Sequence, residues 1–192
     1  MKNNYYFTEI PPSRIATFDV YSIGQLKHHV SALLEFDVTE SRRKLSKLRK
    51  DGTHISFNAW LIKAISRALE KYPEASSFIY NKKKRITFKG HNISFLVEKQ
   101  VEGQRVPLPM VIDRVNMKSA LNITREIEKV KNQMITKKDI VLDKRSKFYE
   151  RLYYHLPGFL RKMIWRHIIA HPKLAYHKMG NVSITSPGTI GK

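Results

Sequence analysis

The side chains of this sequence that are best suited to proton transfer or metal binding are its histidines. His167 and His171 lie four residues apart, which puts both on one face of a helix, where two metal ligands would stand together. No cysteine or carboxylate is near them, so we predict two surface histidines and no metal. The complete absence of cysteine also excludes a cysteine nucleophile, thiolate ligands and disulfides.

Length and composition indicate one soluble domain. The chain has 192 residues, of which 42% are hydrophobic, and this is enough for a single core. The polar and aromatic start, residues 1–12, has no apolar centre of the kind that a secretion signal needs. The most apolar stretch, residues 156–170, is interrupted by Arg161, Lys162 and Arg166 and is too polar to span a bilayer. With no cysteine present, we predict a cytoplasmic protein.

The net charge of +20 is high for a domain of this size and requires an explanation in terms of partners. The charge could belong to a solvated basic surface that has no binding function. It could also serve to bind a nucleic acid, an anionic membrane surface or a phosphate-rich cofactor. Charge determines association and solubility rather than fold, so the composition leaves these alternatives open.

Hydrophobic periodicity predicts one strand and two helices in the first part of the chain. Residues 28–39 alternate between apolar and polar side chains, which predicts a strand with one apolar face. Thr39 is expected to cap a helix that runs to about Lys50. Ser56 is expected to cap a second helix, which ends before Pro73 and has a wide apolar stripe. Burial of each large side chain in that stripe contributes about 1.5 to 3 kcal/mol, so this helix must pack against a sheet.

The middle and end of the chain alternate between strands and helices. Pro107 and Pro109 have no amide hydrogen, so the strand that contains them should lie at a sheet edge or begin irregularly. Residues 144–178 are basic and aromatic. The predicted strands are residues 77–80, 85–88, 91–98 and 106–113. The predicted helices are one with an apolar stripe of Ala120, Ile123, Ile127, Val130 and Met134, and one at residues 157–171, ended by Pro172.

This order of elements, followed by a Gly-rich strand, resembles the catalytic domain of the 2-oxoacid dehydrogenase acyltransferases, the dihydrolipoamide acyltransferase family, which shares its fold with chloramphenicol acetyltransferase. The resemblance spans nearly all of the chain and implies a single α/β domain, residues 1–192. The implied fold is a two-layer sandwich with a mixed, mostly antiparallel sheet and helices on one face, assembled as a homotrimer. The segments that carry the resemblance are residues 28–39, Ile55-Ser-Phe-Asn-Ala-Trp-Leu-Ile-Lys-Ala, Val106-Pro-Leu-Pro-Met-Val-Ile-Asp with Lys118-Ser-Ala-Leu-Asn-Ile-Thr-Arg-Glu-Ile, and Gly180-Asn-Val-Ser-Ile-Thr-Ser-Pro-Gly-Thr-Ile-Gly191.

The resemblance also implies a chemistry, the transfer of an acyl group between coenzyme A and a thiol or other small acceptor, such as dihydrolipoamide. In the family a histidine takes the proton of the attacking thiol, and a hydroxyl donates to the oxyanion of the intermediate. That hydroxyl falls on Thr185, the candidate catalytic residue; an ordinary strand threonine is the alternative. A histidine that lines the substrate channel falls on His29, the candidate substrate-binding residue; a half-exposed polar residue is the alternative. The chain contains no lipoyl module.

One feature of the family is missing from this sequence, the His-x-x-x-Asp-Gly motif that supplies the base. The single Asp-Gly pair is Asp51-Gly52, and the residue four positions before Asp51 is Lys47. We therefore expect the 192 residues to be the domain without its C-terminal part and to be inactive alone. A natural remnant that cannot catalyse the reaction is the alternative.

A basic domain that binds nucleic acid or an anionic membrane surface is the non-enzymatic hypothesis. The helix at residues 157–171 places cations beside Trp165 and several apolar side chains. This pattern is typical of a helix packed on its domain, and it also suits an anionic membrane surface. Tyr153, Tyr154 and Trp165 could stack on bases, but no nucleic-acid-binding motif is present, so nucleic acid is the less favoured partner.

Overall fold

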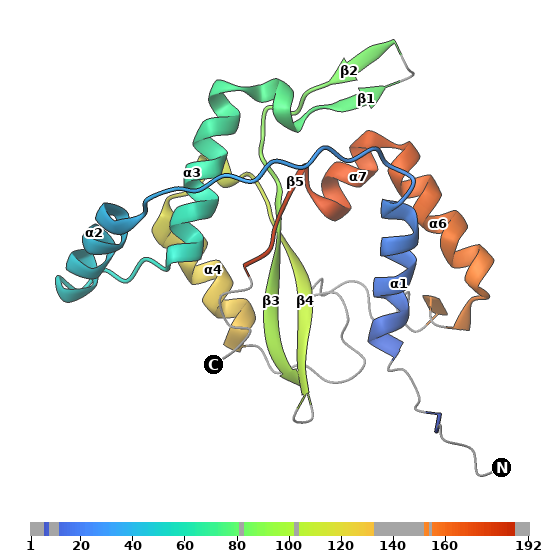
Figure 1. The fold of residues 1–192 in the computed structure, drawn as a ribbon, viewed down its shortest axis with the longest axis horizontal. Coiled ribbons are helices and arrows are strands. Elements are labelled where there is room, and N and C mark those ends of the chain that lie inside the picture. Colours follow the sequence, from blue (N-terminus) through green and yellow to red (C-terminus); the bar gives the residue numbers. More distant parts are fainter. Residues whose placement is uncertain are drawn as a thin grey trace.

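The computed structural model describes residues 6–7, 12–80, 83–101, 104–132, 152–153 and 155–186, in which helices surround two small sheets (Figure 1). One sheet is the β1–β2 hairpin, and the other has the strand order β4-β3-β5. In chain order the elements are α1 Pro12–Gly24, α2 Thr39–Lys50, α3 Phe57–Lys71, η1 Pro73–Ser76, β1 Phe78–Tyr80, β2 Lys84–Ile86, β3 Ile93–Val101, β4 Gln104–Ile112, η2 Val115–Met117, α4 Ala120–Asn132, α6 Gly158–Ala170, α7 Pro172–Met179 and β5 Val182–Ile184.

The three-stranded sheet is mixed, as predicted. β3 is the central strand and pairs antiparallel with β4, from Ile93 opposite Ile112 to Val101 opposite Gln104. β5 lies parallel to β3 on its other side, with Ile93 opposite Val182. Among the described strands β4 is therefore at the edge, which confirms the position that its two prolines predicted.

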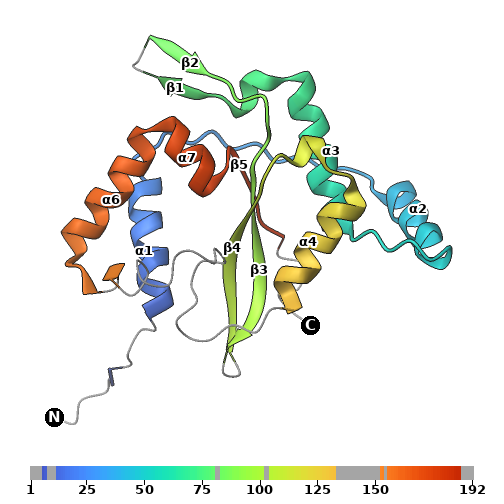
Figure 2. The same ribbon diagram turned by 180° about the vertical axis from the view of Figure 1, so that it is seen from behind.

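Helices α3 and α4 form a layer on one face of this sheet (Figures 1 and 2). α3 begins as predicted, because the Ser56 hydroxyl accepts a hydrogen bond from the amide of Ala59 at 3.2 Å. The other sheet face is open, since Leu96 of β3 and Ser183 of β5 are exposed. This is the predicted two-layer architecture. Its core consists of Ala59, Ile62, Ile93, Phe95, Val97, Met110, Ile112, Val115, Ile123, Ile127 and Ile184.

A second group of helices, α1, α6 and α7, lies beside the sheet, on the side where β4 lies (Figures 1 and 2). α6 packs against both α1 and α7, and α7 also touches β1. The bounds of α6 confirm the helix predicted at residues 157–171, and α4 confirms the predicted helix before it. Met134, the last residue of that helix's predicted apolar stripe, lies outside the described residues, as does Tyr154. None of the helices described is both long enough and apolar enough to cross a bilayer.

The strand predicted at residues 28–39 is wrong. Residues 28–38 are extended but pair with no strand among the described residues, and Val30 and Leu33 are 99% and 100% exposed. Alternation alone does not make a strand, because its backbone groups need a partner edge. The predicted cap is also wrong: Val38 precedes α2, and the amide of Thr39 donates to the Asp37 carboxylate at 2.8 Å. Hydrogen bonds from the side chain and from the backbone amide of Thr39 lower the pKa of Asp37.

Candidate active site on the open face of the sheet

Thr185 follows directly after the last residue of β5, and β5 fixes where it lies. In the parallel pairing, Ser94 is opposite Ser183 and Phe95 is opposite Ile184. Ile184 is buried in the core, whereas Ser183 and Thr185 are exposed. Because side chains two residues apart point to the same face of a strand, the two hydroxyls lie on the open face, near Leu96.

The hydroxyl of Thr185 forms no hydrogen bond with any part of the chain that the structure describes. It is neither buried in the core nor used to cap a helix, so it is free to donate to a bound molecule. An exposed donor directly after a strand of a packed sheet has the backbone support that an oxyanion-binding group needs.

A group of hydrogen bonds around Asn92, which we name the Asn92 clamp, holds the beginning of β5 against β3. The Asn92 amide donates to the Asn181 side-chain oxygen at 2.9 Å, and the Asn181 amide donates to the Asn92 carbonyl at 2.8 Å. The side-chain oxygen of Asn92 accepts from the amide of Arg114 at 2.9 Å and from the hydroxyl of Tyr176 at 3.0 Å. Asn92 is 2% exposed, and its bond with the Tyr176 hydroxyl is fully buried.

Gly180 allows this clamp to form. Its φ of +73° lies in the region that favours glycine, and a Cβ atom there would stand 2.3 Å from the carbonyl oxygen of Asn92. Any side chain at this position would push the backbone of β5 away from β3. The Gly-rich beginning of the motif thus has a packing reason, and it lies five residues before Thr185.

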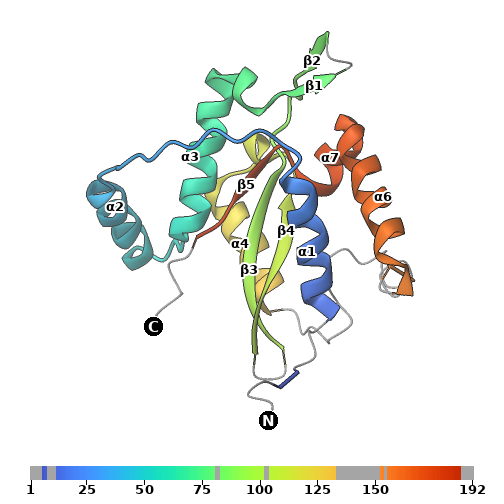
Figure 3. The ribbon, with the colours of Figure 1, turned by 45° about the vertical axis from the view of Figure 1, so that its right-hand side comes forward.

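His29 lies in the extended segment between α1 and α2, which crosses the molecule on the side where β5 lies (Figures 1 and 3). Its side chain is exposed and forms no hydrogen bond within the described residues. The structure therefore does not join His29 to Thr185 by any direct contact. The two candidate residues predicted from the sequence are both accessible, but on separate elements.

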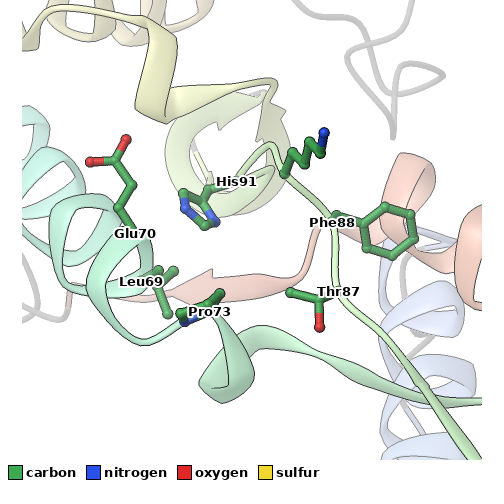
Figure 4. A pocket seen from close by; sticks show the side chains of 7 residues that line it. Leu69, Glu70, Pro73, Thr87, Phe88 and His91 are labelled. Atoms are coloured by element: carbon green, nitrogen blue, oxygen red, sulfur yellow. The ribbon is translucent and has the colours of Figure 1, made fainter.

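A buried histidine that sequence analysis passed over, His91, lines an open hollow of about 420 Å³ (Figure 4). The side chains of α3 and those of the segment before β3 surround its ring. His91 is 2% exposed, and its Nδ1 atom has no hydrogen-bond partner in the described structure. Burial lowers the pKa of His91, the nearby Glu70 raises it, and Lys63 lowers it further. The hollow is lined by Leu69, Glu70, Pro73, Thr87, Phe88, Lys89 and His91.

His91 lies too far from Thr185 to take the proton of a thiol that reacts beside that hydroxyl. His91 precedes Ile93 by two residues, and Thr185 follows Val182, the partner of Ile93, by three. At about 3.3 Å per residue, these five positions separate the two residues by roughly 16 Å along the strands. Direct proton transfer requires a heavy-atom distance of about 3 Å.

Protonation of His91 should make the stability of the protein depend on pH. The folded chain binds this proton less readily than the unfolded chain, whose histidine has a pKa near 6.5. The contribution of neutral His91 is therefore fully present above pH 6.5 and is lost as the pH falls below it, by at most about 1.4 kcal/mol per pH unit. Urea unfolding across this range should show that slope, and His91→Leu should flatten it.

A second substitution at the same position separates the loss of the titrating group from the loss of packing. His91→Gln keeps a polar side chain at this buried position but cannot bind the proton, so it should flatten the pH slope as His91→Leu does. A slope that persists in both variants would show that His91 is not its origin.

A second hollow, of about 730 Å³, adjoins the first and shares Phe88 and Lys89 with it. Phe88 stacks on Tyr176 with 3.9 Å between ring centroids, which ties α7 to the segment before β3. Lys89 and Arg114 place two cations on its wall. The described residues contain no group of three potential metal ligands, and the His167 and His171 rings lie at a tilt to each other, with 4.2 Å between their centroids.

The described elements form a two-layer α/β domain with an exposed hydroxyl on its open sheet face. Residues 25–140 match the family described as 2-oxoacid dehydrogenases acyltransferase (catalytic domain). The chain therefore belongs to this family. Thr185 lies beyond the matched residues, so this match does not address its role. A comparison with curated protein sequences found no match.

Solved structures of dihydrolipoamide acyltransferase cores share the fold. The cubic core of the pyruvate dehydrogenase multienzyme complex is 22% identical, with a TM-score of 0.55, over 66% of this chain and 54% of that one. The Azotobacter vinelandii dihydrolipoamide acetyltransferase is 22% identical, with a TM-score of 0.54, over 66% and 55%. A probable dihydrolipoamide acetyltransferase from Listeria monocytogenes is 19% identical, with a TM-score of 0.58, over 100% and 67%. The matched region thus spans little more than half of the first two chains.

Proposed function

We propose that this domain transfers an acyl group between the thioester of coenzyme A and a thiol acceptor of the dihydrolipoamide type, and that Thr185 binds the oxyanion. The observation that carries the proposal is the free hydroxyl of Thr185 on the open sheet face of a chain of this family. The fold provides what such a donor needs, a fixed strand on one side and solvent access on the other.

Thr185 acts after the acceptor thiol has lost its proton. The thiolate sulfur attacks the carbonyl carbon of the thioester, and the carbonyl π electrons move to oxygen. Thr185 donates its hydroxyl hydrogen to that negatively charged oxygen in the tetrahedral intermediate. The intermediate then collapses, the bond to the sulfur of coenzyme A breaks, and the proton reaches that departing sulfur.

The proton acceptor for the thiol is not among these residues in our proposal. The sequence has no His-x-x-x-Asp-Gly motif, and His91 is too distant. The Azotobacter structure belongs to an investigation of a serine, a histidine and an asparagine in the catalytic mechanism of that enzyme. A threonine at position 185 offers the same kind of hydroxyl as that serine.

We further propose that the domain works in the cytoplasm as a homotrimer and that His29 contacts the acceptor. Two observations support assembly into an oligomer. The solved structures with a similar fold include cores of multienzyme complexes. Residues 28–38 expose apolar side chains that a second copy of the chain would cover. Lysines and arginines would meet the phosphates of coenzyme A. His29 lies in the same exposed segment. A second copy that covered residues 28–38 would therefore place His29 at the boundary between two subunits.

Retention on immobilised coenzyme A tests this function without requiring turnover. We expect the chain to be displaced by free coenzyme A at constant ionic strength. The second candidate, nucleic-acid binding, rests on the cationic exposed helix α2, which has no buried residue. That role predicts elution from heparin with a steep salt dependence and no response to coenzyme A. The chain by itself should transfer no acetyl group from acetyl-CoA above background, and robust turnover would refute our assignment of the base.

A further inference from the structure

The outward side of α6 has an unusual composition for a solvent-exposed helix face. Its exposed residues recur at spacings of three and four, which places them on one stripe. Phe159 and Met163 in this stripe are 65% and 60% exposed. We name this stripe the α6 outer face. It consists of Phe159, Lys162, Met163, Arg166 and His167.

The α6 outer face is cationic, and no exposed carboxylate opposes it within its helical group. The sequence has no aspartate or glutamate after Glu150. Asp19 is the one carboxylate of α1, the helix that packs on α6. It is 5% exposed and pairs with Arg161 of α6 at 2.7 Å. The negative charge is therefore buried and neutralised, while Lys162 and Arg166 remain exposed to solvent.

A partly buried network of hydrogen bonds fixes which side of α6 faces outward. The hydroxyl of Tyr153 donates to the Asp19 carboxylate at 2.6 Å, and the indole of Trp165 donates to the Tyr153 oxygen at 2.9 Å. Burial, followed by the hydrogen bond to Asp19, raises the pKa of Tyr153 to about 12, so it remains a donor. Since Arg161 and Trp165 face this network, residues on the opposite side of the helix must point to solvent.

Further exposed apolar side chains lie on α1, which packs on α6, and on α6 itself. Phe18 and Tyr21 of α1 are 53% and 67% exposed, and Ile164, at the side of the outer face, is 41% exposed. Figure 3 shows α1 beside α6, between α6 and the sheet. These two helices therefore combine exposed apolar side chains with positive charge that no exposed carboxylate of either helix offsets.

We propose that the α6 outer face docks the protein on an anionic lipid surface, a role beyond the acyl transfer proposed above. Lysine and arginine attract anionic headgroups, and phenylalanine and methionine enter the boundary of the acyl chains. The combination of cations with apolar side chains favours a lipid surface over a nucleic acid as the ligand of this face. A nucleic-acid backbone uses the cations but gains little from an aliphatic side chain such as Met163. The helix lies in the plane of the surface and does not cross it.

Vesicle cosedimentation with the whole chain tests the proposal. The protein should sediment with vesicles of mixed phosphatidylcholine and phosphatidylglycerol and remain in solution with phosphatidylcholine alone. The double variant Phe159→Ser/Met163→Ser keeps the net charge, and it should weaken binding about tenfold because it removes the inserted apolar groups. Its matched control is Tyr72→Ser/Ile79→Ser, which removes apolar groups that are 58% and 79% exposed elsewhere and should bind normally.

Charge variants separate this helix from the overall basicity. Lys162→Gln/Arg166→Gln should weaken binding more than Lys47→Gln/Arg49→Gln on α2, although both remove two positive charges. Unchanged vesicle binding by the Phe159→Ser/Met163→Ser variant would overturn the proposal. Binding that duplex DNA abolishes and that depends on charge alone would assign the face to nucleic acid. A change of particle mass in that variant without lipid would assign it to contact between copies of the chain.

Discussion

Replacing Thr185 by valine is expected to lower the rate of acyl transfer by about 10² to 10³, the usual effect of losing one oxyanion donor. Valine has nearly the same shape and lacks only the hydroxyl. The experiment uses this chain joined to a C-terminal segment that contains a His-x-x-x-Asp-Gly motif, so that turnover can be measured. The loss should fall on kcat, because the hydrogen bond forms with the charge that develops during the reaction. Thr185→Ser should retain most of the activity.

Ser183 provides a matched control for this substitution. It lies two residues before Thr185, is also exposed, and occupies the same face of β5. Ser183→Ala should therefore leave kcat nearly unchanged if the position of the hydroxyl matters rather than its presence on the strand. Both side chains are exposed, so neither change should alter the free energy of unfolding by more than about 0.5 kcal/mol. An active Thr185→Val enzyme would place oxyanion stabilisation elsewhere.

The helices could be predicted because their signals are local. In α3 the cap at Ser56 and the apolar residues that follow lie within one segment, and the structure places both as expected. Pro107 and Pro109 likewise predicted an edge strand from their own chemistry, since neither can donate to a ladder. Such features need no knowledge of what the rest of the chain does.

Features that depend on distant partners could not be predicted in this way. Residues 28–38 alternate as a strand would, but nothing in the sequence reveals whether an edge is available for them to pair with. The bonds of the Asn92 clamp join Asn92 to residues up to 89 positions away. His91 has no motif that marks it, and its burial depends on side chains of α3 and of other segments that pack around it.

The candidate site also has one part that the sequence predicted and one part that only the structure revealed. Thr185 was identified through the resemblance of the segment around it to a known family, and the structure shows that its hydroxyl is exposed and without a partner in the described chain. The reason why β5 holds its place against β3 came from the structure alone. A glycine in a Gly-rich strand suggests a close approach of two backbones, but the approaching atom, the carbonyl oxygen of Asn92, could not be named beforehand.

Replacing Gly180 by alanine should destabilise the protein by roughly 2 to 4 kcal/mol, because it combines backbone strain with a clash. The new methyl group would lie 2.3 Å from the Asn92 carbonyl oxygen and 3.2 Å from the amide nitrogen of Ser94, both rigid backbone atoms. β5 would have to separate from β3 at the point where the clamp holds it. Urea unfolding measures the loss. Faster amide hydrogen exchange along β5 would locate it.

Gly52 separates the strain from the clash. Its φ of +85° also favours glycine, but a Cβ atom there would meet nothing within 4 Å. Gly52→Ala should therefore cost only the conformational strain, about 1 kcal/mol. If Gly180→Ala were no more destabilising than Gly52→Ala, the close approach to Asn92 would not be holding β5 in place. The difference between the two substitutions thus measures how firmly the clamp fixes the strand that leads to Thr185. In a form that turns over, Gly180→Ala should lower kcat as well, because Thr185 then loses its fixed position without losing its hydroxyl.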